Sequence, residues 1–154
     1  MNYFNLEEFE KLKATVKTEY KKIGSIYSPA LKADIVFNSN GIYHLRYDNN
    51  RSERNKHVQN NKLRFFQTSV DVLKIATTIQ EYRRVVISNE TSKLSVIEWF
   101  AFWAIISFQK KTRIKIIIKR IGGEDGLYHF WSVMPYWTLR HKDRILGNRD
   151  LESE

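Results

Sequence analysis

The sequence contains no cysteine, and only two prolines and six glycines interrupt its 154 residues. The lack of cysteine excludes a disulfide framework, a zinc–thiolate site and a thiol nucleophile, and it is compatible with a reducing cytoplasm, where we expect the protein. Because no stretch is rich in proline, glycine or serine, the sequence offers no linker. We therefore expect one domain over residues 1–137, followed by a charged tail over residues 138–154.

No hydrophobic run is long enough to cross a membrane. The most apolar stretch, residues 94–108, contains Glu98 and is shorter than the ~20 residues that a bilayer requires. The first ten residues carry glutamates at positions 7, 8 and 10, where a signal peptide would have an apolar segment. We expect no membrane partner.

The familiar sequence motifs of several enzyme classes are also missing. There is no glycine-rich phosphate loop, no HExxH and no GxSxG. The acidic residues are scattered, and no pair of them flanks an apolar strand end as a two-metal nuclease requires. We therefore expect no metal and no cofactor.

Positive charge is the most prominent feature that the sequence does have. Lysine and arginine number 26 against 17 aspartates and glutamates, which gives a formal net charge of +9. Apolar residues make up 42% and aromatic residues 14% of the chain, enough for a folded core. A folded domain with this charge favours a polyanionic partner, and nucleic acid is the leading candidate.

The first half of the chain has mostly helical patterns. Apolar residues recur at helical spacing from Leu6 to Tyr20, Asn5 and Glu8 form a capping pair, and Gly24 provides a stop. After a turn around Pro29, the expected elements are a short strand over 33–37, a short helix from 39 or 40 to 45, a helix over 52–66, and a further helix that begins at Ser69.

The second half changes to the alternation of strands. β-branched and aromatic residues alternate with polar ones over 84–88, 114–118 and 127–133, and residues 94–108 form either a strand pair or one long strand. Short polar segments between them are suited to tight turns, so we expect an antiparallel meander. Helices followed by a sheet predict an α+β fold.

Three segments carry side chains suited to phosphate chemistry. Residues 44–57 contain His44, Arg46, Arg51, Arg54, Lys56 and His57. Arginine offers a planar fork to phosphate oxygens, and histidine moves protons near neutral pH. The alternative interpretation is a solvated helix face.

The second segment, residues 110–120, has six cations and no acid. It is suited to binding a nucleic-acid backbone, or it is simply the exposed side of a half-buried strand. In the third segment, residues 128–135, Ser132 could donate to a phosphate, while Tyr128 or Phe130 could stack on a base. Core aromatics are the simpler interpretation of that strand.

The order of these motifs resembles that of a known family. An N-terminal helix is followed by Ile26–Pro29, by Val36–Asn38 with Gly41–Leu45, by Arg51 to Arg54, and by a closing Phe130–Pro135. This pattern resembles the phage-type barnase/EndoU/colicin/RelE-like (BECR) nucleases. The resemblance implies an α+β ribonuclease with N-terminal helices packed on a C-terminal four-stranded antiparallel sheet, and metal-independent cleavage that leaves a 2′,3′-cyclic phosphate. Proteins of this kind act as toxins or as effectors of phage and mobile elements.

The resemblance also implies roles for particular residues. His44 would transfer protons, Arg51 or Arg54 would stabilise the phosphate, and Ser132 would bind it. The remaining expected RNA contacts are Arg46, Lys56, His57, Lys110, Lys111, Arg113 and Lys115. We therefore expect a small cytoplasmic endoribonuclease whose partner is RNA, with an inhibitory protein as a further candidate partner. The alternative is a nucleic-acid-binding or toxin-neutralising module that uses the same basic surface without chemistry.

Overall fold

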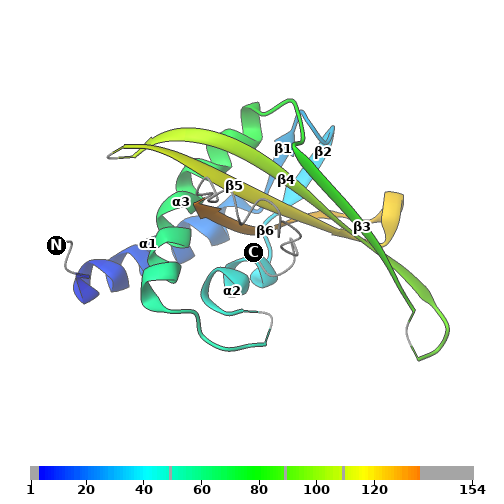
Figure 1. Ribbon diagram of the computed structural model, residues 1–154, viewed down its shortest axis with the longest axis horizontal. Coiled ribbons are helices and arrows are strands. Elements are labelled where there is room, and N and C mark those ends of the chain that lie inside the picture. The colour runs from blue at the N-terminus through cyan, green and yellow to red at the C-terminus, as the bar shows by residue number, and fades with distance from the viewer. Residues whose placement is uncertain (1–3, 49, 89, 109, 136–154) are drawn as a thin grey trace, which may run out of the picture.

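The structure is a computed structural model that describes residues 4–48, 50–88, 90–108 and 110–135. In this part of the chain, three α-helices pack on a six-stranded sheet (Figure 1). The protein is therefore α+β. The charged tail that the sequence predicts over residues 138–154 lies outside the described residues.

Each α-helix begins at an asparagine whose side-chain oxygen accepts hydrogen bonds from free backbone N–H groups. Asn5 caps α1 (Leu6–Ile23), Asn38 caps α2 (Ser39–Arg46), and Asn55 caps α3 (Lys56–Ile75). Helix α1 ends at Gly24, whose positive φ of 65° suits a residue without a Cβ. These local signals explain why the helices begin where they do.

The two separate helices predicted over 52–66 and from Ser69 are wrong, because α3 runs through both segments. Ser69 does not cap a new helix. Its buried hydroxyl donates to the Phe66 carbonyl at 2.6 Å and is satisfied inside the continuous helix.

The sheet has the strand order β1-β2-β6-β5-β4-β3. The last four strands in sequence form an antiparallel meander, and strand β2 runs parallel to β6, pairing Ile35 with Tyr128 and Val36 with His129. The strands are β1 (Ser25–Ser28), β2 (Ala33–Val36), β3 (Glu81–Ser88), β4 (Leu94–Phe108), β5 (Lys110–Ile121) and β6 (Tyr128–Pro135). A 3-10 turn, η1 (Gly123–Asp125), links β5 to β6.

The expected four-stranded antiparallel sheet is therefore wrong. The antiparallel hairpin of β1 and β2 adds two strands, and its contact with β6 makes the sheet mixed. The alternation in Ser25–Ser28 lasts only four residues, too few to identify a strand from sequence, and pairing with β6 joins segments far apart in the chain. Residues 94–108 form one long strand.

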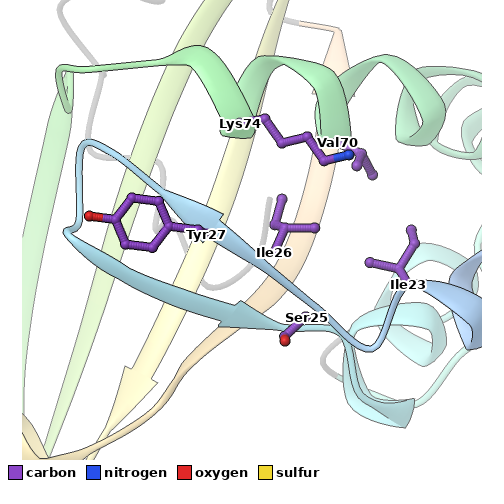
Figure 2. Close-up of a pocket in the computed structure, with 6 residues that line it drawn as sticks. All are labelled: Ile23, Ser25, Ile26, Tyr27, Val70 and Lys74. Carbon is purple, nitrogen blue, oxygen red and sulfur yellow. The ribbon is translucent and has the colours of Figure 1, made fainter.

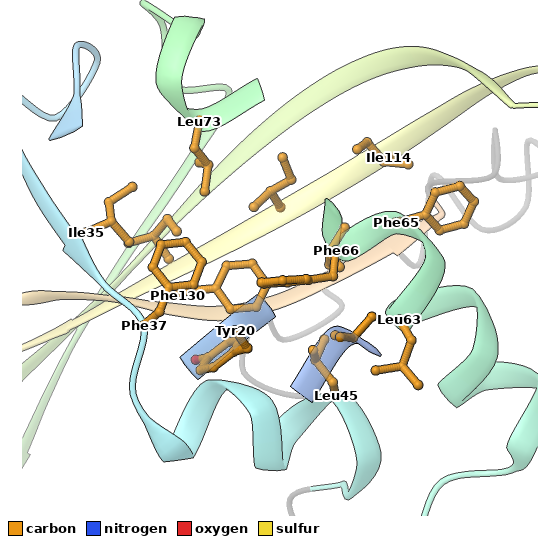
Figure 3. Packing of buried hydrophobic residues seen from close by; sticks show 14 of the residues in the cluster. Tyr20, Ile35, Phe37, Leu45, Leu63, Phe65, Phe66, Leu73, Ile114 and Phe130 are labelled. Carbon is orange, nitrogen blue, oxygen red and sulfur yellow. The ribbon is translucent and has the colours of Figure 1, made fainter. Parts of the chain in front are cut away.

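The core lies between the helices and one face of the sheet. Phe37, Phe66 and Phe130 meet there with Tyr20, and the rings of Phe37 and Phe130 stack with centres 5.2 Å apart (Figure 3). The hairpin of β3 and β4 extends away from the helices (Figure 1). Among the described residues, no helix is both long and apolar enough to span a membrane.

Candidate functional site

Helix α2 places His44 against strand β6. Gly41 allows this close packing, because a Cβ at that position would overlap the Phe130 carbonyl and the Tyr20 hydroxyl. His44 is only 3% exposed. Its imidazole stacks on the indole of Trp131, with ring centres 4.3 Å apart and an interplanar angle of 25°.

Arg54, in the segment between α2 and α3, holds His44 through two contacts. Its Nη2 lies 3.2 Å from Nε2 of His44, and its Nε donates to the His44 carbonyl at 3.0 Å. Arginine can only donate. Nε2 of His44 is therefore the acceptor, and the hydrogen of the neutral ring is on Nδ1.

The surroundings of His44 strongly disfavour its protonated form. Burial, and then the charges of Arg54, Lys62 and Lys119, lower the pKa of His44 to about 3. The imidazole is therefore neutral at pH 7. Such a group can accept a proton in a reaction, but it lacks the second ring proton with which an imidazolium acts as an acid.

Lys62 and Ser132 form the second part of the cluster. Nζ of Lys62 donates to Oγ of Ser132 at 2.8 Å and to the Val133 carbonyl at 3.3 Å. Lys62 is 3% exposed and Ser132 is fully buried. Sequence reasoning missed Lys62, although its spacing from the buried Gln59 and Phe66 places it on the inward face of α3.

Trp131 and Lys119 complete the cluster from the sheet. In the pairing of β5 with β6, Ile117 faces Ser132 and Ile118 faces Phe130, which leaves Trp131 as the extra residue of a β-bulge. Nζ of Lys119 lies 4.1 Å from the centre of a Trp131 ring, a cation–π contact. We call these six residues, His44, Arg54, Lys62, Lys119, Trp131 and Ser132, the cationic cluster.

The two arginines that the sequence offered as alternatives for stabilising the phosphate lie in different environments. Arg54 contacts His44 directly. Arg51 is exposed in a turn, where its φ is 62° and its backbone N–H donates to the Asp48 carbonyl. Ser132 is linked to His44 through Lys62, because Lys62 donates to the serine hydroxyl and its charge also contributes to lowering the pKa of His44.

The other residues of 44–57 that were predicted to contact RNA are Arg46, Lys56 and His57. Arg46 is half-buried, with Nη2 3.8 Å from a Glu53 carboxylate oxygen. Lys56 and His57 are exposed at the start of α3, and the His57 ring packs against Phe4 with centres 4.7 Å apart.

The six cations of residues 110–120 do not form one surface. Lys115 is buried and paired with Glu81 at 3.0 Å, and Arg120 is paired with Glu98 at 2.7 Å. Because both side chains are largely buried and paired with a carboxylate, they are poorly accessible to a nucleic acid. Lys111 is exposed and Arg113 is half-buried, and the side chain of Lys110 lies outside the described part of the structure.

A groove of about 530 Å³ opens elsewhere, between β1 and the helices (Figure 2). It contains none of the cationic cluster, and its walls bring no acid–base pair together. Its lining residues are Ile23, Ser25, Ile26, Tyr27, Val70 and Lys74. We therefore place the candidate site at the cationic cluster.

No group of three or more potential ligands (histidine, cysteine, aspartate or glutamate) that could hold a metal ion occurs in the described ranges. Comparisons with protein-family models, curated proteins and solved structures find no match. The function must therefore be argued from the geometry of the cationic cluster.

Proposed function

We propose that the protein is a metal-independent endoribonuclease that cleaves RNA by attack of a 2′-hydroxyl on the neighbouring phosphate. The observation that carries the proposal is the contact of neutral His44 with Arg54, beside Lys62, Lys119 and Ser132. Positive charges held in place next to a proton acceptor are what a pentacoordinate phosphate transition state requires. The resemblance of the motifs to BECR nucleases supports the same chemistry.

In this mechanism Arg54 changes partners. In the free protein its Nη2 occupies the lone pair of His44 Nε2. When a phosphate binds, the guanidinium would turn to the anion and free Nε2, because charge-assisted hydrogen bonds to phosphate are stronger than those to a neutral ring. The incoming negative charge would also raise the pKa of His44 toward its ordinary value.

The cleavage step transfers one proton to His44 and takes one proton from water. Nε2 of His44 takes the proton of the 2′-hydroxyl, a bond forms between O2′ and phosphorus, and the bond from phosphorus to O5′ breaks. The leaving O5′ takes a proton from water, and the hydroxide that remains takes the proton from Nε2 of His44, which returns to its neutral form. The products are a 2′,3′-cyclic phosphate and a 5′-hydroxyl, while Lys62 and Ser132 stabilise the phosphate oxygens. We place this activity in the cytoplasm, where an inhibitory protein is a candidate partner.

One observation favours a second function, nucleic-acid binding without cleavage. Only 3% of the surface of His44 is exposed, and the lone pair of its Nε2 is already occupied by Arg54. A histidine with both features commonly has a structural role. In that case the cations would still bind RNA, or would bind an acidic partner as a toxin-neutralising module.

The experiment is incubation of the purified protein with end-labelled RNA in EDTA. The variants are His44→Gln and Arg54→Ala, with Lys17→Ala as the control because Lys17 is an exposed cation on α1, outside the cationic cluster. We expect the wild type and Lys17→Ala to cleave equally and to leave cyclic phosphate ends. His44→Gln should lose at least about a hundredfold in rate, the typical contribution of a positioned acid–base group, and Arg54→Ala should lose a similar factor because it removes a positive charge from the transition state.

Each contrary outcome has a distinct meaning. Cleavage that stops on addition of EDTA would contradict the metal-independent mechanism. Equal cleavage by His44→Gln would remove His44 from the reaction. Binding of RNA without any cleavage by the wild type would favour the second function.

A further inference from the structure

A pair of stacked tyrosines lies at the C-terminal end of α2, the helix that carries His44. The rings of Tyr43 and Tyr47 are 4.4 Å apart between centres, with an interplanar angle of 14°. Tyr43 directly precedes His44, and the Tyr47 N–H donates to the Tyr43 carbonyl at 2.9 Å. The i, i+4 spacing at the end of the helix explains why the two rings meet.

One arginine lies against this stack. Cζ of Arg46 lies 5.4 Å from the centre of the Tyr47 ring. The Arg54 N–H donates to the Arg46 carbonyl at 2.8 Å, so the segment after α2 folds back and brings Arg54 to the same helix end. The outer ring of the stack, Tyr43, is 45% exposed. An exposed aromatic ring in a stack that an arginine contacts combines the two features that bind a nucleobase and its phosphate.

We infer that Tyr43 is a stacking site for a nucleobase adjacent to the phosphate held at the cationic cluster, and that the substrate is single-stranded RNA. This inference rests on the proposed function and adds the class of substrate. Stacking on Tyr43 requires an exposed base face. The bases of a duplex already stack on their neighbours, so a duplex cannot offer one without being opened.

The test uses a short, non-cleavable 2′-O-methyl RNA that contains one 2-aminopurine, single-stranded or annealed to its complement. Binding is followed by anisotropy, and stacking by quenching of the 2-aminopurine fluorescence. The variants are Tyr43→Ala, Tyr43→Leu and Tyr43→Phe. The matched control is Tyr27→Ala, because Tyr27 is a 57% exposed tyrosine on β1, outside the cluster.

We expect the wild type to bind the single strand more tightly than the duplex and to quench its fluorescence. Tyr43→Ala and Tyr43→Leu should each weaken binding about tenfold and lose the quenching, as expected for one lost stacking contact. Tyr43→Phe and Tyr27→Ala should behave as the wild type. Because leucine keeps an apolar side chain on α2, a loss in both Tyr43→Ala and Tyr43→Leu with unchanged circular dichroism is not a folding defect.

The inference is overturned if Tyr43→Ala binds and quenches as the wild type does, or if the duplex binds as tightly as the single strand. It is also overturned if Tyr43→Phe is as weak as Tyr43→Ala, since the hydroxyl would then be responsible. In these cases the wild type still binds RNA, and the proposed function survives. A wild type that binds neither form removes both proposals.

Discussion

The imidazole of His44 lies nearly parallel to the indole of Trp131, 4.3 Å away between ring centres. This contact joins a short helix to the bulged position of β6. It also removes His44 from water, so that the ring stays neutral among three neighbouring cations. The stability and the reactivity of the site therefore depend on the same buried ring.

The folded protein should lose stability in mild acid because of His44. Its folded-state pKa is about 3, below the ordinary value near 6.5, so the unfolded chain binds the extra proton first. The stabilisation is fully present above about pH 6.5 and is lost as the pH falls toward 3. Between pH 7.5 and pH 5 this linkage amounts to about 2 kcal/mol.

The measurement is urea unfolding of the wild type and of His44→Gln at both pH values. The wild type should lose about 2 kcal/mol more than the variant over this interval. His57→Gln, which changes an exposed histidine, is the control variant. Identical pH dependence in wild type and His44→Gln would contradict the buried neutral state.

Lys62 and Ser132 should behave as a coupled pair. Ser132→Ala removes an acceptor from a buried ammonium group, and we expect a cost of about 1–3 kcal/mol. Lys62→Met leaves the buried serine hydroxyl without its donor. In a double-mutant cycle followed by chemical unfolding, the two costs should fall short of additivity by about 0.5–3 kcal/mol. Strictly additive effects would show that the contact contributes nothing.

Glu98 should be a major contributor to stability away from the site. Its carboxylate accepts from the Tyr82 hydroxyl at 2.5 Å and pairs with Arg120 at 2.7 Å, while both charged side chains are largely buried. Glu98→Gln leaves the guanidinium without its anion, and we expect a loss of about 3–5 kcal/mol. Glu10→Gln is the control: it breaks the surface ion pair of Glu10 with Lys13 and should leave the unfolding temperature close to that of the wild type, because exposed ion pairs contribute little. Thermal unfolding of both variants compares them.

Gly41→Ala should loosen α2 from β6. The added Cβ would overlap the Phe130 carbonyl, which is held in the sheet and cannot move aside easily. We expect a loss of about 1–3 kcal/mol, as for overpacked cores. Asn40→Ala, at the neighbouring exposed position, should change stability by less than about 0.5 kcal/mol. Denaturant midpoints of the two variants give the comparison, and a stable Gly41→Ala would show that α2 can shift at little cost.

The sequence predicted the parts of the fold that depend on local signals. The Asn5 cap and the helical spacing of α1 are confirmed, and so are the strands predicted around 114–118 and 127–133. The hairpin strand β1 and the parallel contact of β2 with β6 were missed, because the pairing of Ile35 with Tyr128 depends on segments distant in the chain. No local pattern contains that information.

In the candidate site, too, the sequence identified residues by their type but not the contacts between distant segments. His44, Arg54 and Ser132 stand out by residue type, and the structure brings them into one neighbourhood. Lys62 was missed because a lysine in a polar helix is usually solvated, whereas here it reaches a buried serine. Lys115 was expected on the surface, and its burial depends on Glu81 from another strand. Composition identifies candidate cations, but only tertiary pairing decides which remain available to a ligand.

Strand β6 follows the other described strands in the sequence, and it joins two parts of the sheet. It pairs with β5 on one side and with the early strand β2 on the other. During translation the hairpin of β1 and β2, and helix α2 with His44, emerge well before Trp131 and Ser132 exist. A nascent chain that has not reached residue 132 therefore lacks the assembled cluster. Under the proposed function, neither the ribosome that makes the protein nor the message being read meets the assembled cluster before residue 132 has been made.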